Sequence, residues 1–511
     1  MSSNDSPLSS FATLAFFNDQ AGEQAQGLLK NLESLGYSSM TPIQAQSLPL
    51  ILEGKDVIGQ AKTGSGKTAA FGLGLLARLE PTRFKVQSLV LCPTRELADQ
   101  VAKALRDLAR SIPNVKVLTL CGGTPFGPQA GSLEHGAHIV VGTPGRVNDH
   151  LSRGTLDLSQ VSALVLDEAD RMLDMGFQDE LDAIEAATPS GRQTLMFSAT
   201  FSNDIKAVAS RIMREPEKVT AAVAEEKSTI EQHFFVANGD EERLDALCLL
   251  LLAHTPESTV VFCNTKQETR DVAEALRNKG FSALAIHGDL EQADRDRTLL
   301  RFVNKSIHVL VATDVAARGL DIDALDAVIN YQIAGDVEVH VHRIGRTGRA
   351  GSSGMAFTLF AGKEHYKVER IEGYMGIEVS PEPLPASSLL EQKPAQPTMA
   401  TLQIDGGKKQ KLRPGDILGA LTGKGGIQGK QVGKINIFDN AAYVAVAVDA
   451  VTQAMSKLSN DKLKGRSFKV RQVRGQPTNS RRLARQKGRI RDRGAEPDNS
   501  GGSSLYKGKR R

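Results

Sequence analysis

The sequence predicts an α/β protein made of two tandem parallel-sheet domains, followed by a small α+β domain and a disordered basic tail. Three observations lead to this prediction. The chain has 511 residues, which is too long for one hydrophobic core and indicates two or three domains. Apolar, β-branched runs alternate with helical patterns in two separate stretches. Basic residues are concentrated near the C-terminal end.

The two alternating stretches have the pattern of right-handed βαβ units on a parallel sheet that is buried on both faces. The predicted strands of the first stretch are 56–59, 88–92, 115–120, 137–141, 163–166 and 194–197. Residues 217–229 are charged and polar, and there we expect a linker without a strand. The pattern then resumes with predicted strands at 258–263, 282–287, 307–312 and 327–331.

The C-terminal part has a different pattern. Residues 382–397 are rich in Pro, Ser, Ala and Gln, as is typical of a linker. Predicted elements follow in βαββαβ order, which fits a small sheet with helices on one side, at 401–404, 415–421, 433–438, 442–448, 450–458 and 467–473. Beyond residue 475 nothing is periodic, so we expect a disordered tail. The predicted parts are domains over 1–218 and 230–378, a linker over 379–398, a domain over 399–474 and a tail over 475–511.

The charge distribution separates an enzyme-like body from a basic end. Residues 399–511 contain 25 Lys and Arg against 8 Asp and Glu, a net charge of +17, whereas the first 398 residues carry a net charge of −13. Such asymmetry indicates a C-terminal module that binds a polyanion.

Composition argues against several other classes of protein. The four cysteines lie far apart without CxxC spacing, so we expect buried reduced thiols, no zinc site and no disulfide partner. Residues 1–10 are polar and lack the features of a signal peptide, and no later segment approaches a membrane-spanning length. We therefore expect a cytoplasmic protein with no membrane partner.

The string Ala61-Lys62-Thr63-Gly64-Ser65-Gly66-Lys67-Thr68 lies between a strand-like run and a helical one, as a phosphate-binding loop does. Its glycines would let the backbone approach the phosphates, Lys67 would neutralise β- and γ-phosphate oxygens, and the Thr68 hydroxyl would ligate Mg²⁺. Ala61 stands where the general motif has Gly. The predicted nucleotide-binding residues of the loop are Thr63, Gly64, Ser65, Gly66, Lys67 and Thr68.

A second string, Asp167-Glu168-Ala169-Asp170, follows the apolar run 161–166. Asp167 therefore lies where a buried strand ends, beside the loop in a parallel sheet, which is where such folds bind ligands. There Asp167 would hold Mg²⁺, through water, and Glu168 would orient or deprotonate the attacking water. The two strings together predict an NTPase with Lys67, Asp167 and Glu168 in its catalytic site.

At this point the chain resembles the DEAD-box RNA helicase family, from about residue 11 to residue 377. The shorter strings are not specific one by one, but their joint occurrence in family order is. This resemblance implies two RecA-like domains, ATP with Mg²⁺ as cofactors and RNA as partner. The strings are Thr41-Pro42-Ile43-Gln44, the phosphate loop, Pro93-Thr94-Arg95-Glu96-Leu97-Ala98, Gly122-Gly123, Thr143-Pro144-Gly145-Arg146, the Asp-Glu-Ala-Asp string, Ser198-Ala199-Thr200, Phe262-Cys263-Asn264-Thr265, Gln292 with Arg295, Thr313-Asp314, Arg318-Gly319-Leu320-Asp321 and His342-Arg343-Ile344-Gly345-Arg346-Thr347-Gly348-Arg349.

The resemblance also implies roles for single residues at the nucleotide. Gln44 would recognise the adenine edge, and Asp321 would contact the ribose. Arg346 and Arg349 are similar to the arginine fingers of the family, which the second domain supplies to the γ-phosphate held by the first. An aromatic side chain normally stacks on the adenine. Phe11 fits its pattern and Phe16 or Phe17 fits its spacing, with simple burial as the alternative.

Other implied residues couple hydrolysis to the opening of a duplex or contact RNA. Ser198 and Thr200 are similar to the coupling residues, through hydrogen bonds to Asp170 and to His342. The RNA groove would use glycines and hydroxyls, which suit backbone contacts that do not depend on base sequence. By resemblance its residues are Pro93, Thr94, Arg95, Gly123, Thr143, Gly145 and Arg146 in the first domain, and Thr265, Gly288 and Thr313 in the second.

Residues 400–474 have a resemblance of their own, to the DbpA-type RNA-binding domain, an RRM-like fold. The matching strings are 401–409 and 413–423. This resemblance implies binding to a hairpin of large-subunit ribosomal RNA in pre-ribosomal particles during ribosome assembly. Aromatic residues that could stack on bases are few, namely Phe438, Tyr443 and Phe468, so Lys, Arg and backbone contacts would carry much of the binding. Tyr443 fits the core equally well.

The sequence thus favours an ATP-dependent RNA helicase that locally unwinds or remodels ribosomal RNA. One alternative is an ATP-gated RNA clamp or assembly platform, whose hydrolysis only resets its grip, and unwinding separates the two. A second alternative, a translocating DNA helicase, is distinguished by stimulation of hydrolysis with DNA rather than RNA.

Overall fold

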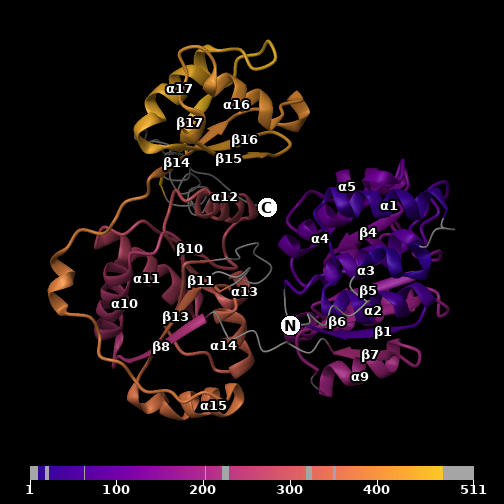
Figure 1. Ribbon diagram of the computed structural model, residues 1–511, viewed down its shortest axis with the longest axis horizontal. Helices are drawn as coiled ribbons and strands as arrows, with labels where there is room; N and C mark the ends of the chain where they lie inside the picture. The colour runs from indigo at the N-terminus through magenta and orange to yellow at the C-terminus, as the bar shows by residue number, and fades with distance from the viewer. Residues whose placement is uncertain are drawn as a thin grey trace, which may run out of the picture. The chain divides into compact units, whose positions relative to one another are not determined.

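The computed structural model describes residues 10–17, 22–61, 64–201, 203–220, 230–317, 325–348 and 353–475. Within these ranges the chain forms two compact units, the first ending at residue 220 and the second beginning at residue 230. Figure 1 labels most of their helices and strands. The predicted tail lies outside the described residues, apart from Gly475. No helix in these ranges is long and apolar enough to span a bilayer.

The first unit contains a seven-stranded parallel sheet in the order β3-β4-β2-β5-β6-β1-β7. All six predicted strands are confirmed. The expectation of a strandless linker at 217–229 is wrong at its start, because Glu217–Thr220 forms β7 at the edge of the sheet. An edge strand needs few apolar side chains, and of these four only Val219 is buried. The strands are β1 (Val57–Gln60), β2 (Ser88–Leu91), β3 (Val117–Leu120), β4 (Ile139–Gly142), β5 (Ala163–Asp167), β6 (Gln193–Ser198) and β7.

Helices cover both faces of this sheet. Successive side chains of a strand point to opposite faces, so Val57 and Ile58 belong to different apolar clusters. One cluster includes α1 (Glu23–Ser34), α2 (Pro42–Glu53), α3 (Lys67–Ala77) and α4 (Arg95–Leu108). The other includes α6 (Pro144–Ser152), α7 (Ala169–Asp174), α8 (Gln178–Ala186) and α9 (Asn203–Ile212). The remaining helix, α5 (Phe126–Glu134), buries no residue completely.

The second unit begins with a six-stranded parallel sheet in the order β10-β11-β9-β12-β13-β8. Its four predicted strands are confirmed, whereas β8 and β13 were not predicted. The strands are β8 (Ile230–Val236), β9 (Thr259–Cys263), β10 (Ala283–Ile286), β11 (Val309–Thr313), β12 (Ala327–Asn330) and β13 (Gly354–Phe360). The helices are α10 (Asp240–His254), α11 (Lys266–Asn278), α12 (Gln292–Val303), α13 (Asp314–Ala317), α14 (Val337–Ile344) and α15 (His365–Met375).

The C-terminal part of this unit is the predicted βαββαβ domain. Its antiparallel sheet has the order β15-β16-β14-β17, and α16 and α17 share one apolar cluster with it, as expected for helices on one side. The elements are β14 (Met399–Ile404), α16 (Pro414–Thr422), β15 (Val432–Ile437), β16 (Ala442–Ala447), α17 (Val451–Asn460) and β17 (Val470–Gln472). Part of the predicted linker is ordered, since Leu384 and Leu390 pack on the core of the preceding parallel sheet.

Arg343 is a buried polar centre of the second parallel sheet. It lies on α14 and is only 2% exposed. Its guanidinium donates to both carboxylate oxygens of Asp314, at 2.6 and 2.8 Å, to Asn264 Oδ1 at 2.9 Å and to the Gln332 carbonyl at 2.7 Å. These partners follow β11, β9 and β12, so one side chain ties α14 to the ends of three strands.

Replacing Arg343 by Met should destabilise the second sheet by about 3 kcal/mol, because it leaves Asp314 without its buried partner. The chain carries its own probes for this effect. Cys248 and Cys263 are buried in the second sheet's unit, while Cys92 and Cys121 are buried in the first. In the variant, thiol labelling at increasing urea, analysed by mass spectrometry, should show that Cys248 and Cys263 become exposed at lower urea. The urea dependence of Cys92 and Cys121 should not change.

Arg270→Met is the matched control. Arg270 pairs with Asp289 at 2.6 Å in the same unit, but both side chains are more than a third exposed, so the pair should contribute little. Equal urea midpoints for the Arg343 and Arg270 variants would contradict the proposed structural role of Arg343.

Candidate nucleotide and RNA sites

The parallel strands of the first sheet all end at one edge, and the predicted nucleotide residues follow three of them. The phosphate loop follows β1, Asp167 ends β5, and Ser198 ends β6. In the sheet order β6 lies between β5 and β1, so one strand separates the strand that ends in Asp167 from the strand that precedes the loop. The loop is nevertheless fixed to β6, since the Ala61 amide donates to the Ser198 carbonyl at 3.1 Å.

The structure describes Ala61 and residues 64–68 of the phosphate loop, whereas Lys62 and Thr63 lie outside the described residues. Gly64 and Gly66 have φ values of +84° and +92°, a left-handed backbone that favours glycine. The Lys67 side chain is buried and its Nζ donates to the Ala61 carbonyl at 3.0 Å, while Thr68 and Ser65 are half-buried. Lys67 begins α3, so the loop leads into the N-terminal end of a helix, where anions are stabilised.

Gln44 and Thr41 hold this loop from α2. The Thr41 hydroxyl donates to the Ser65 carbonyl at 2.8 Å, and Gln44 Nε2 donates to the Gly66 carbonyl at 3.0 Å. Gln44 Oε1 in turn accepts from the Thr41 amide at 2.8 Å. A Cβ at Gly66 would come within 2.5 Å of Gln44 Nε2, so a larger residue there would displace the Gln44 amide. The residue expected to recognise adenine is therefore also a support of the phosphate loop.

Asp167 is buried, and its Oδ1 has no hydrogen-bond partner in the described part of the chain. Burial raises its pKa to about 6, although the nearby Lys67 ammonium opposes that rise. A buried carboxylate oxygen without a partner fits a cation such as Mg²⁺, which takes one or two carboxylates and completes its shell with water and phosphate. No cluster of three or more potential His, Cys, Asp or Glu ligands occurs among the described residues, and Mg²⁺ does not need one.

The backbone of Glu168 could not be anticipated from the sequence. Its φ of +53° and ψ of 52° are left-handed, a conformation that costs a non-glycine residue on the order of 1–3 kcal/mol and is concentrated at functional sites. Glu168 is half-buried between β5 and α7.

Asp170 and Thr200, expected to act together, are in contact. Asp170 Oδ2 accepts from the Thr200 amide at 3.1 Å and from its hydroxyl at 3.2 Å. Within the described ranges, the buried Ser198 hydroxyl has no partner. His342, the fourth predicted coupling residue, lies on α14 of the second unit. The first sheet therefore links the Asp-Glu-Ala-Asp string to the end of β6 by two hydrogen bonds.

The residues expected to contact RNA follow the other strands of the same edge. In the first unit they lie beyond the ends of β2, β3 and β4, and Thr94 and Thr143 are the N-cap residues of α4 and α6. Gly123 and Gly145 are exposed, so their backbones are accessible. Strands β3-β4-β2 thus carry the RNA candidates Pro93, Thr94, Arg95, Gly123, Thr143, Gly145 and Arg146, and β5-β6-β1 carry the nucleotide candidates.

The second unit has a similar arrangement. Thr265 is the N-cap of α11 after β9, Gly288 follows β10, and Thr313 ends β11. Arg346 is half-buried just beyond α14, whereas Arg349 and Asp321 lie outside the described residues. Sequence reasoning gave no role to Arg343, because its burial and its polar partners depend on the tertiary fold.

The three phenylalanines near the start differ in burial. Phe11 and Phe17 are only 3% and 6% exposed and belong to the apolar core, whereas Phe16 is half-buried against it. Of the three, Phe16 is therefore the most accessible for stacking on adenine.

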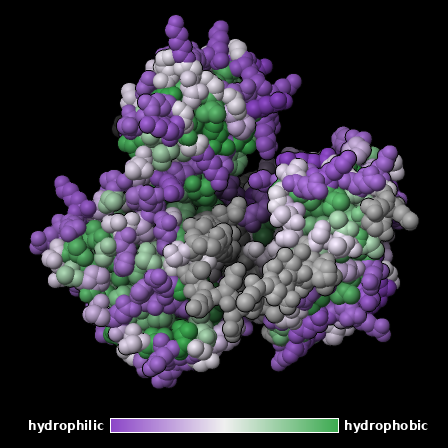
Figure 2. Space-filling model, in the orientation of Figure 1, coloured by the Kyte–Doolittle hydropathy of each residue, from purple (hydrophilic) through white to green (hydrophobic). Residues whose placement is uncertain are grey.

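In the C-terminal domain, Phe438 is 42% exposed and meets Tyr443 edge to face at 5.6 Å. Tyr443 is half-buried, and burial raises its pKa. The Lys408 amide donates to the Phe438 carbonyl at 2.8 Å, so a basic loop is bonded to the backbone of Phe438. Phe468 instead packs closely on Gly406. In Figure 2 hydrophilic side chains border the visible face of this domain.

Three protein-family models match this chain. A DEAD/DEAH box helicase model covers residues 41–208, a helicase conserved C-terminal domain model covers 242–351, and a DbpA RNA binding domain model covers 401–472. These ranges fall on the first parallel sheet, the second and the antiparallel sheet, respectively.

Relatives and solved structures agree with the models. The ATP-dependent RNA helicase DbpA of Escherichia coli strain K12 is 53% identical over 443 residues, which is 87% of this chain and 96% of that protein. The DEAD-box ATP-dependent RNA helicase CshA of Geobacillus kaustophilus is 45% identical over 68% of this chain and 74% of its own length. The structure of S. cerevisiae Dbp5 bound to RNA and ADP BeF3 has a TM-score of 0.64 and 30% identity, covering 70% of this chain and 93% of that one. The chain therefore belongs to the DEAD-box family of ATP-dependent RNA helicases and carries a DbpA-type RNA-binding domain.

Proposed function

We propose that this helicase hydrolyses ATP at the β5-β6-β1 half of its first sheet and remodels RNA held at the β3-β4-β2 half. The observation that carries the proposal is the pair of hydrogen bonds from Thr200 to Asp170, which joins the nucleotide string to the end of β6. Asp167 and Glu168 lie only three and two residues before Asp170. Hydrolysis of the γ-phosphate beside them would therefore affect the Asp170–Thr200 hydrogen bonds.

At the nucleotide, the phosphate loop would bind the phosphates and Gln44 the adenine, with Asp321 at the ribose. Asp167 and Thr68 would hold Mg²⁺, which when bound neutralises phosphate charge. Glu168, at its strained position, would accept a proton from the attacking water. Arg346 and Arg349 would stabilise the charge of the transferring phosphoryl group, a task suited to the rigid guanidinium fork. Support for these roles comes from the orphaned Asp167 Oδ1 and from the motif order.

For RNA, the proposed groove uses exposed backbone at Gly123 and Gly145 with the helix N-termini at Thr94 and Thr143, which favour phosphates. Thr265, Gly288 and Thr313 would extend it on the second sheet. Such contacts hold a strand without recognising its sequence, so selection of a target must come from another part of the chain.

We assign that selection to the C-terminal domain, with a hairpin of large-subunit ribosomal RNA as target and ribosome assembly as the process. The proposal is supported by the match to the DbpA RNA binding domain and by the exposed Phe438 beside the basic 406–411 loop. Stacking on an aromatic ring and charge contacts are the usual means of binding unpaired bases.

Glu168→Gln should leave ATP and RNA binding intact and lower RNA-stimulated ATP turnover by roughly 10² or more, because the amide cannot accept the proton. Phosphate release measured at saturating ATP and RNA checks this result. Glu33→Gln, at an exposed position on α1, is the control and should keep its turnover. Near-normal turnover of Glu168→Gln would rule out its proposed role.

Thr200→Val removes one of the two bonds to Asp170, and a hydrogen bond to a charged group is worth about 1.5–3 kcal/mol. Duplex unwinding should therefore fall at least about tenfold, with a smaller loss of RNA-stimulated hydrolysis. Thr194→Val is the matched control, because Thr194 lies on β6 and its hydroxyl donates only to the Ile212 carbonyl, at 3.4 Å.

Strand-displacement and phosphate-release assays on the same samples give both rates. Parallel loss of both activities would argue against a coupling role for Thr200. Hydrolysis without any strand displacement by the unmodified protein would instead favour the ATP-gated clamp.

Deleting residues 399–511 should equalise the stimulation of ATP hydrolysis by ribosomal and unrelated RNA. Deleting only residues 475–511 should weaken binding of all RNAs alike, because a basic tail gains affinity mainly by releasing counterions. For each phosphate that the tail neutralises, log K for single-stranded RNA falls by about 0.7 for each log unit of salt. RNA affinity is measured at several salt concentrations for the cognate hairpin and a scrambled one. Loss of discrimination with an unchanged salt slope in the shorter deletion would show that the tail, rather than the domain, selects the target.

A further inference from the structure

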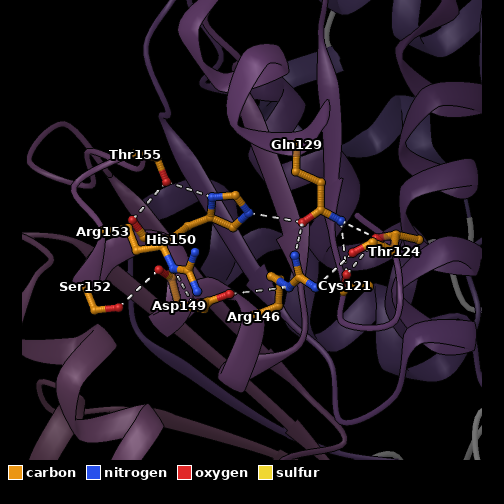
Figure 3. Close-up of polar contacts among 9 residues, drawn as sticks. All are labelled: Cys121, Thr124, Gln129, Arg146, Asp149, His150, Ser152, Arg153 and Thr155. Atoms are coloured by element: carbon orange, nitrogen blue, oxygen red, sulfur yellow. Dashed lines mark hydrogen bonds and ion pairs between the residues drawn. The ribbon is translucent and has the colours of Figure 1, made fainter. Parts of the chain in front are cut away.

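A compact polar cluster joins the turn after β3 to α5 and α6 in the first unit (Figure 3). Its centre is Gln129 of α5, a residue outside every motif that the sequence analysis used. Around it lie Thr124 of the turn and two residues of α6, Arg146 and His150.

All the polar atoms of the Gln129 amide have partners. Its Nε2 donates to the Cys121 carbonyl at 3.0 Å and to the Thr124 hydroxyl at 2.6 Å. Its Oε1 faces His150 Nε2 at 3.0 Å and accepts from Arg146 Nη1 at 3.3 Å. The two donor bonds fix the orientation of the amide, so its oxygen must point toward α6.

His150 is completely buried. Because Gln129 Oε1 can only accept, His150 Nε2 carries a proton. His150 Nδ1 lies 2.8 Å from the Thr155 hydroxyl, which also lies 3.1 Å from the His150 carbonyl. Burial lowers the pKa of His150, and so does the Arg146 guanidinium, which favours the neutral ring. The ring also stacks on Phe126 of α5, with centroids 4.1 Å apart and planes 15° from parallel. His150 therefore has a proton on Nε2 and a fixed orientation.

Arg146 is held by the same cluster. Its Nη2 donates to the Thr124 carbonyl at 3.0 Å, in addition to the bond from Nη1 to Gln129. Its Nε lies 3.9 Å from Asp149, and the side chain is 13% exposed. One RNA candidate, Arg146, is thus tied to the turn that contains another, Gly123, whose φ is +71°.

We propose that Gln129 and His150 are positioning residues for RNA, which hold Arg146 and the 122–124 turn in one geometry before RNA binds. The inference rests on the proposed RNA groove and adds to it the two residues that connect its separate segments. A site that is already arranged loses less conformational entropy on binding, so the affinity for RNA depends on this cluster although neither residue touches RNA.

The test compares Gln129→Met, which keeps the volume of the side chain and removes its polar atoms, with His150→Ala. Each should raise the RNA concentration for half-maximal ATPase stimulation about tenfold, the effect of leaving one polar partner unsatisfied. At saturating RNA, kcat and the KM for ATP should stay unchanged. His150→Gln should restore most of the RNA affinity, because its amide N–H can again donate to Gln129 Oε1.

Two matched controls come from the same unit. Gln160→Met removes an exposed glutamine that accepts from Arg83 Nη2 at 2.8 Å, and His135→Ala removes an exposed histidine next to α5. Neither should change the RNA concentration for half-maximal stimulation. Thermal unfolding of each variant is recorded in parallel to separate positioning from a general loss of stability.

Arg146→Ala separates the failure of this inference from the failure of the groove itself. If Arg146→Ala weakens RNA affinity and Gln129→Met lowers only the unfolding temperature, the positioning role is wrong and the groove stands. The positioning role is also wrong if His150→Gln lowers RNA affinity as much as His150→Ala does. If Arg146→Ala leaves RNA affinity unchanged, both the groove assignment and the inference fail.

Discussion

Parallel strand direction is the constraint on which the two sites depend. In a sheet whose strands all run one way, every strand ends at the same edge, and residues far apart in sequence meet there. The phosphate loop after β1, Asp167 at the end of β5 and Thr143 after β4 share this edge because of strand direction, although about a hundred residues separate the first from the second. The strand order then divides the edge into a half with the proposed nucleotide residues and a half with the proposed RNA residues. No side-chain contact alone would produce that division.

Strand β6 gives the nucleotide half its connections. It lies between β1 and β5 and hydrogen-bonds to both, so its end is adjacent to the phosphate loop on one side and to Asp167 on the other. Ser198 and Thr200 follow this strand, and Thr200 is bonded to Asp170. The buried Ser198 hydroxyl lacks a partner among the described residues. In the RNA half, the cluster centred on Gln129 has the corresponding role of fixing separate segments relative to one another.

Much of this arrangement could be predicted from the sequence, and the failures have physical causes. Buried strands such as β5 were found because both faces are apolar, whereas β7 was missed because only Val219 of this edge strand is buried. The phosphate loop is a local motif, so its position was predictable. The left-handed backbone of Glu168 and the burial of Arg343 depend on tertiary packing and leave no pattern in the sequence. Gln129 and His150 belong to no motif.

The central claim is that nucleotide and RNA bind at two halves of one edge and affect each other. Linkage requires that the factor by which RNA changes nucleotide affinity equal the factor by which nucleotide changes RNA affinity. Both factors can be measured by equilibrium titration of the full chain, with a non-hydrolysable ATP analogue and a short single-stranded RNA. The account predicts equal factors of about 5–150, the usual range of coupling between sites. Independent binding, with both factors near one, would contradict it.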